Sequence, residues 1–204
     1  LRQLTSQFDP HFLYNTLDTI NWMAIDRDEY EISNSITALA SILRYGINKS
    51  NAIVTVREEC EWLRQYLFLQ QTRLKNTFEC GIHVSPEVLE WRVHKLLLQP
   101  FVENSILHGF EGKKGTHKLE IELIPKYNSL QIVIWDNGRG IPDELTEQMN
   151  QGIFPVNHEK SHIGMENAIN RIHMYYGEDA KVLIESKKEE FTRIQIQIPH
   201  REEA

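Results

Sequence analysis

The sequence predicts an α+β protein in which a helical hairpin precedes an α/β sandwich. Two observations support this class. Apolar residues recur at helical spacing through residues 1–50, whereas residues 51–204 contain segments in which apolar and polar residues alternate, with helical segments between them. Strands that alternate in this way have one buried and one solvated face. Helices are therefore expected to cover a single face of the sheet.

The first fifty residues predict two antiparallel helices. Each carries an apolar stripe: Leu13, Leu17, Ile20 and Ala24 in the first, and Ile32, Ile36, Leu39 and Leu43 in the second. The polar sequence D-R-D-E-Y connects them, Gly46 is the expected end of the second, and residues 47–54 are the expected linker. Because two such helices cannot bury their stripes alone, we expect two copies to pair as a four-helix bundle, which makes the chain a homodimer.

Residues 51–204 predict a single second domain. Thr55 and Glu58 form a capping-box pattern at the start of a helix that runs to about Leu74. Alternating apolar residues then predict five strands, around residues 78–84, 119–123, 130–134, 182–184 and 194–198. Cys60 and Cys80 fall within these patterns and are expected to be core thiols, with no disulfide.

Composition limits the classes of partner. The chain has 204 residues, a formal net charge of -7 and 25% charged residues. Its acidic balance argues against nucleic acid as the main partner. No apolar run approaches the length needed to cross a membrane, and we expect a chain from a reducing, intracellular compartment.

The sequence D-N-G-R-G-I-P, at residues 136–142, directly follows a predicted strand. The carboxylate of Asp136 can accept a hydrogen bond from an exocyclic amine such as that of adenine. Gly138 and Gly140 allow the backbone to approach a ligand closely and to adopt positive φ. The heptapeptide alone is more typical of a surface β-turn.

Residues 96–109 predict an apolar helix that ends at Gly109 and is interrupted by Glu103 and Asn104. Buried polar side chains need partners, and an amide oxygen such as that of Asn104 is a suitable ligand for Mg²⁺. The alternative is a helix whose polar face meets water. A further helix is expected from about Gly164 to Gly177, where backbone N–H groups at the entrance near Gly164 would favour phosphate.

The order of these three segments resembles the GHKL ATPase superfamily over about residues 55–200. The resemblance implies a Bergerat-type α/β sandwich that binds ATP and Mg²⁺. It implies that His108, Asp136, Gly138, Gly140 and Gly164 contact the nucleotide and that Asn104 ligates the metal. Residues 142–161 resemble the ATP lid of the family.

The sequence Q-F-D-P-H-F-L-Y-N-T-L, at residues 7–17, is similar to the phosphoacceptor segment of LytS/YesM-type sensor histidine kinases. The resemblance implies that His11 is phosphorylated, and a neutral imidazole is a competent nucleophile. Asn15 lies on the same helical face and could orient the ring or a phosphoryl oxygen. Asp9 stands where relatives usually have Asn, so the general base is open between Asp9 and Glu103.

The resemblance as a whole implies a two-component sensor histidine kinase that autophosphorylates from Mg-ATP and passes the phosphoryl group to a response regulator. It implies the cytoplasmic portion of a membrane-anchored bacterial receptor, attached through an upstream region. Two alternatives remain: a nucleotide-binding dimeric scaffold without transfer, and a GHKL ATPase that acts on another partner.

Overall fold

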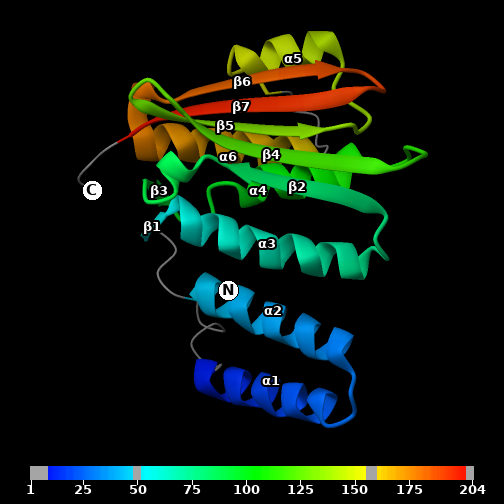
Figure 1. Ribbon diagram of the computed structural model, residues 1–204. Coiled ribbons are helices and arrows are strands. Elements are labelled where there is room, and N and C mark those ends of the chain that lie inside the picture. Colours follow the sequence, from blue (N-terminus) through cyan, green and yellow to red (C-terminus); the bar gives the residue numbers. More distant parts are fainter. Residues whose placement is uncertain (1–8, 48–51, 155–159, 201–204) are drawn as a thin grey trace.

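The computed structural model describes residues 9–47, 52–154 and 160–200, with only the backbone at residues 160–163. It confirms the α+β class (Figure 1). A helical hairpin packs on helix α3, and α3 in turn packs beside a layered sheet and helix domain. Half of the predicted linker, residues 48–51, lies outside the described residues. The rest is largely regular structure, since Ile47 ends a helix and Ile53–Thr55 forms a strand.

The hairpin consists of α1 (Pro10–Ile25) and α2 (Tyr30–Ile47). Asp9 caps α1: its Oδ1 accepts the backbone N–H of His11 at 2.9 Å, and Pro10 occupies the first helical position. Helix α2 continues one residue beyond the end predicted at Gly46. Within the described hairpin only small or central side chains are buried: Leu17, Ala24, Ser33 and Ala38.

Helix α3 (Val56–Arg73) begins with the predicted capping box. The hydroxyl of Thr55 accepts the backbone N–H of Glu58 at 3.2 Å, and the Glu58 carboxylate accepts the backbone N–H of Thr55 at 2.8 Å. Just before α3, β1 (Ile53–Thr55) pairs antiparallel with β3 (Arg92–His94) in a small sheet that the sequence did not predict. This pairing fixes the start of α3 against the loop that leads to α4.

The main sheet contains all five predicted strands: β2 (Phe78–Val84), β4 (His117–Lys126), β5 (Ser129–Asp136), β6 (Lys181–Lys187) and β7 (Phe191–Pro199). Their order is β2-β4-β5-β7-β6, with β2 and β4 parallel and the other neighbours antiparallel. Short 3-10 turns at Pro86–Val88 and Gly177–Asp179 complete the domain.

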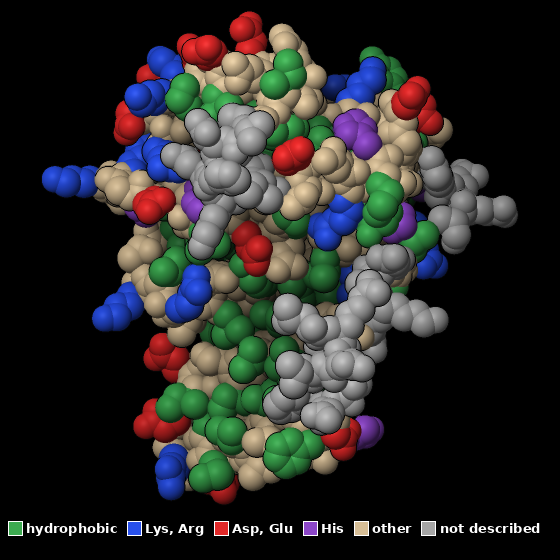
Figure 2. Space-filling view, turned by 180° about the vertical axis from the view of Figure 1, so that it is seen from behind, with side chains coloured by type: hydrophobic (Ala, Val, Ile, Leu, Met, Phe, Trp, Pro, Cys, Tyr) green, Lys and Arg blue, Asp and Glu red, His purple; other side chains and the backbone are tan. Residues whose placement is uncertain are grey.

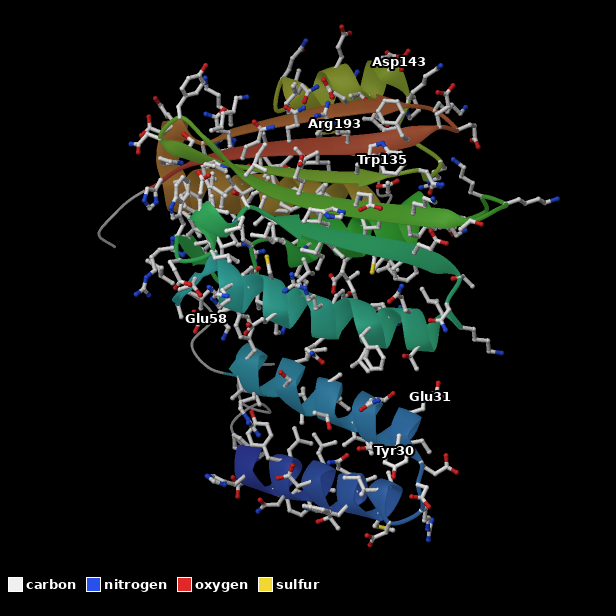
Figure 3. All side chains as sticks on the ribbon, viewed as in Figure 1. Tyr30, Glu31, Glu58, Trp135, Asp143 and Arg193 are labelled. Carbon is white, nitrogen blue, oxygen red and sulfur yellow. The ribbon has the colours of Figure 1, made fainter. Side chains whose placement is uncertain are left out.

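Helices cover one face of this sheet. The inner residues of β5 and β7, including Ile132 and Ile196, are buried in one core with Phe101 of α4 (Gln99–Asn104) and Ile172 of α6 (Lys160–Tyr176). The opposite face carries polar and amphipathic side chains. Trp135 and Arg193 lie there on paired strands (Figure 3). One buried and one solvated face is the arrangement that the alternation predicts.

Helix α5 (Asp143–Asn150) lies along the free edge of β6 (Figure 1). The side chain of Asn150 donates to the carbonyl of Ile184 at 2.8 Å and accepts its N–H at 2.9 Å, so it occupies edge groups that a neighbouring strand would otherwise pair with. Within the described ranges, no helix combines the length and the apolar character needed to cross a membrane.

Candidate functional site

Asp136 ends β5 and is buried, with 2% of its surface exposed. Its Oδ2 accepts the hydroxyl of Ser105 at 2.6 Å, and its Oδ1 accepts the backbone N–H of Gly138 at 2.9 Å. Burial raises the pKa of this carboxyl, while the two hydrogen bonds and the positive charge of Lys113 oppose the rise. A carboxylate held by two donors retains further lone pairs, and these can accept an amine from a ligand.

The glycines after Asp136 are required by close packing. A Cβ at Gly138 would overlap the carbonyl of Gly109 and the carboxylate of Asp136. Gly140 has φ of 65°, and a side chain there would meet the backbone of Lys187 in the β6–β7 turn. The positive φ expected for this motif is therefore confirmed at Gly140.

The loop that carries these glycines is held by its neighbours. The N–H of Arg139 donates to the carbonyl of Gly109 at 2.7 Å, and its carbonyl accepts the N–H of Glu189 at 2.6 Å. Lys113 supplies the third restraint. Its ammonium donates to the carbonyls of Asn137 and Gly138, and it reaches those of Glu189 and Glu190 at 3.1 and 3.3 Å.

Ser105 and Lys113 are the two contributors that sequence reasoning missed. Their partners lie 31 and 24 residues away, and neither belongs to a periodic pattern. The one local signal was the position of Ser105, directly after the Glu-Asn pair in an apolar helix.

The predicted helix over residues 96–109 is shorter and less regular than expected. Leu96 has a positive φ of 58°, and α4 begins at Gln99. From Ser105 to Gly109 the chain is π-helical, and the cap residue is Phe110. The helical segment thus ends at Gly109, as predicted, but Gly109 lies inside its last turn and not beyond it as a C′ cap. Asp136 packs on Gly109, because a Cβ there would lie 3.0 Å from Oδ1 of Asp136.

Glu103 and Asn104 lie in the last turn of α4 and are partly exposed. Oε1 of Glu103 accepts the hydroxyl of Tyr66 at 3.0 Å and the amide of Gln99 at 2.8 Å. Within the described residues, no side-chain hydrogen bond engages Asn104. Asn104 directly precedes Ser105, whose hydroxyl donates to Asp136. Asn104 is therefore next in the chain to a residue that contacts the candidate nucleotide-binding carboxylate. His108 is partly exposed in the π-helical segment.

Gly164 does not lie at a helix entrance. Helix α6 begins at Lys160, four residues earlier than the sequence suggested, so Gly164 sits just past its first turn. Gly164 is exposed, and a Cβ there would meet no atom within 4 Å. The lid segment includes residues 155–159, which lie outside the described residues.

His11 and Asn15 are exposed on α1, where His11 occupies the second helical position. The carboxylate of Asp9 is engaged in capping that helix. The structure brings Asp136, Gly138 and Gly140 together with the π-helical segment. It does not bring His11 to them, because α1 is the outermost layer, beyond α2 and α3 (Figure 1).

Comparison with known proteins matches two stretches of the chain to family models. Residues 1–78 match the family model described as "Histidine kinase", and residues 92–202 match "Histidine kinase-, DNA gyrase B-, and HSP90-like ATPase". The sensor histidine kinase YesM of Bacillus subtilis is 33% identical over the whole chain, which covers 34% of that protein. The sensor protein kinase HptS of Staphylococcus aureus is 29% identical over 98% of the chain and 38% of its own length. The chain thus spans about a third of the length of these curated relatives.

Two solved structures share the fold. The catalytic domain of histidine kinase ThkA has a TM-score of 0.54 at 16% identity, covering 74% of this chain and 98% of that one. The histidine kinase domain of the blue-light activated kinase of Erythrobacter litoralis has a TM-score of 0.52 at 12% identity, with 94% of each chain covered.

Residues 92–202 match the family model of these ATPases. They contain a buried carboxylate at a strand end, beside a glycine-rich loop, on a sheet that helices cover on one face. This part of the chain is an ATP-binding domain of the GHKL type. Residues 1–78, which match the histidine kinase model, contain the exposed His11 on α1. The chain belongs to the histidine kinase-, DNA gyrase B- and HSP90-like ATPases, among their LytS/YesM-type sensor histidine kinases.

Proposed function

We propose that this chain is the catalytic portion of a two-component sensor histidine kinase that transfers the γ-phosphoryl group of ATP to His11. Residues 1–50 would act as the dimerising phosphotransfer hairpin, and residues 51–204 as the ATP-binding domain. A receiver domain of a response regulator would then take the phosphoryl group onto an aspartate. Attachment to the membrane would come from an upstream region of the full receptor.

The observation that carries the proposal is the exposure of His11 within the segment that matches histidine kinases. Asp9 caps the helix through the backbone N–H of His11, which leaves the imidazole in solvent and accessible to a nucleotide site. A histidine that served only the packing of the hairpin would be expected on its buried side, with Leu17 and Ala24.

The nucleotide site fits ATP. The carboxylate of Asp136 can accept the adenine amine, and the Gly138 and Gly140 backbone leaves room that side chains would fill. Gly164 and His108 complete the proposed contacts. Asn104 fits Mg²⁺ as a single neutral oxygen ligand, since this ion keeps waters and phosphate oxygens around it. When bound, the metal supplies charge stabilisation on the phosphates.

The proposed transfer forms one bond to phosphorus and breaks another. A nitrogen of the His11 imidazole forms a bond to the γ-phosphorus, the bond from that phosphorus to the bridging oxygen breaks, and ADP leaves. The ring proton passes to a base, for which Glu103 and Asp9 are the candidates. The chain contributes chiefly positioning, with Asn15 placed one helical turn from His11 to orient the ring or a phosphoryl oxygen.

Incubation with γ-labelled ATP tests the proposal. The unmodified chain should acquire label that is lost in acid and retained in base, as for a phosphorylated imidazole. His11→Gln should abolish the label and leave nucleotide affinity within a few fold, because the histidine lies outside the Asp136 site. His173→Gln, which changes an exposed histidine of α6, is the matched control.

The alternatives give different results in the same assay. Nucleotide binding without label would indicate a scaffold, and release of inorganic phosphate without protein label would indicate an ATPase that acts on another partner. Equal labelling of the unmodified chain and His11→Gln would contradict the assignment of His11.

A further inference from the structure

Three stacked aromatic rings connect the hairpin to the proposed active site. Tyr45, in the last turn of α2, stacks on Trp62 of α3 with ring centroids 5.6 Å apart. Trp62 stacks on Tyr66 at 5.4 Å and an interplanar angle of 13°. The hydroxyl of Tyr66 then donates to Oε1 of Glu103 at 3.0 Å. The proposed catalytic carboxylate therefore has one of its two donors at the end of a stack that begins in the hairpin.

A buried carboxylate provides a second connection from the same tyrosine. The hydroxyl of Tyr45 donates to Oε2 of Glu59 at 2.8 Å, and Glu59 is 1% exposed. Glu59 also accepts the backbone N–H of Leu96 at 2.9 Å and that of Leu98 at 3.3 Å. These two residues form the turn from which α4 begins, so Glu59 fixes the start of the helix that ends in Glu103 and Asn104.

The turn before α4 is strained and is also tied to α6. Leu96 has a positive φ of 58°, which is unfavourable for a leucine. Arg171 of α6 donates to its carbonyl at 2.7 Å. Such a conformation persists only when its surroundings enforce it, and here the surroundings include Glu59. A change at Tyr45 can therefore reach α4 through this turn as well as through the stacked rings.

We propose that Tyr66 is a positioning residue for Glu103, and that the Tyr45–Trp62–Tyr66 stack makes the position of α4 depend on how α2 docks on α3. This inference rests on the proposed function, since it assigns a regulation to the same site. A signal that shifts α2 would then change the rate of phosphoryl transfer with little change in nucleotide affinity, because the Asp136 side of the site is also held by the Gly138 backbone N–H and by Lys113, which lie outside α4.

The packing of the Tyr45–Trp62–Tyr66 stack has features that would allow α2 to shift on α3. The indole N–H of Trp62 is buried without a hydrogen-bond partner among the described residues, which makes this arrangement less favourable than one with all groups satisfied. Tyr45 itself is only partly buried. Burial and the neighbouring carboxylates raise the pKa of Tyr45 and of Tyr66, so both hydroxyls keep their protons and remain donors.

Tyr66→Phe provides the direct test, because it keeps the stacked ring and removes only the hydroxyl. Labelling of the full chain at saturating ATP should fall about tenfold, the loss expected when one hydrogen bond to a charged side chain is removed. The KM for ATP should stay within twofold. Tyr127→Phe, at a tyrosine that is 97% exposed, is the matched control and should label normally.

A double-mutant comparison separates positioning from general destabilisation. In a Glu103→Gln background, Tyr66→Phe should cause little further loss, because its partner is already altered. Equal losses in both backgrounds, or a normal rate for Tyr66→Phe alone, would overturn the proposal.

Backbone hydrogen exchange tests the link to the hairpin without requiring activity. Tyr45→Leu should increase exchange in residues 99–104 at least threefold relative to Tyr127→Phe and should leave residues 129–136 unchanged. Unchanged exchange in α4 would overturn the inference. Failure of the proposed function would instead be seen as labelling that does not depend on His11.

Discussion

The hairpin and the sandwich differ in how they bury apolar surface. The sandwich has one continuous core that joins the inner face of the sheet with α3, α4 and α6. Among the residues that the structure describes, thirteen large hydrophobic side chains are exposed, and the hairpin holds eight of them, including Phe12, Ile20, Trp22 and Met23. Figure 2 shows hydrophobic side chains over the lower part of the molecule, where Figure 1 places α1 and α2.

The difference indicates that the two parts are stabilised in different ways. The sandwich contains the partners for its own apolar residues, whereas the described hairpin packs on the rest of the molecule through one side of α2. It packs chiefly against α3, and the carbonyl of Tyr45 also accepts the ammonium of Lys95. An apolar groove lined by Ile32, Ile36, Leu39 and Leu69 runs beside that contact. Exposed apolar surface of this extent favours association, which supports the proposed homodimer through the hairpin.

The largest effect, on the stability of the proposed dimer, is expected when charged side chains replace the exposed apolar residues Ile20 and Met23 of α1. Ile20→Glu combined with Met23→Glu places four carboxylates in a symmetric interface and removes four apolar side chains from it. The dissociation constant of the dimer should rise by roughly a hundredfold or more. Sedimentation measures this, with Leu183→Glu on the sandwich as control. If the doubly substituted chain stays dimeric at the same concentration, α1 is not the interface.

Asp136→Asn tests the sandwich alone. The replacement presents an N–H group toward the adenine amine, and the loss of a hydrogen bond to a charged group costs about 1.5–3 kcal/mol, or roughly ten- to hundredfold in affinity. Calorimetric titration with ATP and ADP measures it, and Asp143→Asn, at an exposed carboxylate of α5, should bind normally. Dimerisation should be unaffected, since the hairpin is distant. Unchanged affinity would exclude Asp136 as the adenine contact.

Asn104→Ala is expected to reduce transfer at least tenfold, about 1.4 kcal/mol of barrier, by removing the proposed metal ligand. Chelation of Mg²⁺ should stop labelling of the unmodified chain. Label incorporation at saturating ATP is compared with that of Asn128→Ala, a substitution at an exposed turn. A variant that melts normally by circular dichroism and labels at the original rate would show that Asn104 is not the ligand.

The smallest effect, about three- to fivefold in nucleotide affinity, is expected from Lys113→Met, which removes one restraint on the glycine loop. Lys113 also lowers the pKa of Asp136 against the effect of burial. Without it that pKa rises further, so affinity for ADP should begin to fall at a higher pH on acidification. Titrations with ADP at several pH values compare Lys113→Met with Lys114→Met, a control at an exposed lysine. Identical pH profiles would contradict this role.

The effect of pH on the stability of the fold, through Asp136, is opposite to its expected effect on nucleotide affinity. Because the folded pKa of Asp136 is raised, the folded protein binds this proton more tightly than the unfolded chain does. The contribution of Asp136 to the free energy of unfolding is therefore greatest below its ordinary pKa, and it decreases as the pH rises through the raised value. Acid thus favours the fold locally while it removes the ionised form of Asp136 that is proposed to bind adenine.

The sequence predicted the features that depend on local pattern. All five strands of the main sheet were located, because burial of one face produces alternation over several residues. The three-residue strands β1 and β3 were missed, because they are too short to show it. Asp136 was found by its position at a strand end. Ser105 and Lys113 could not be found, because their roles depend on contacts between distant segments.

The errors within the helices have a similar origin. Apolar spacing alone could not show that α4 gives way to a wider turn at Ser105 or that α6 begins before Gly164. The wider turn at Ser105 coincides with a contact between distant segments, the hydrogen bond from Ser105 to Asp136. All the predicted roles of site residues stay predictions for the assays above: His11, Asn15, Glu103, Asn104, His108, Asp136, Gly138, Gly140 and Gly164.

The π-helical turn at Ser105–Gly109 places a constraint on chain length. A turn of this kind holds one residue more than an α-helical turn. If a residue were deleted and the wide turn were kept, the missing residue would rotate α4 by about 100° relative to the chain after Gly109. Glu103 and Asn104 would then face a different direction from Asp136. A survey of natural variation should therefore find substitutions in this turn far more often than insertions or deletions.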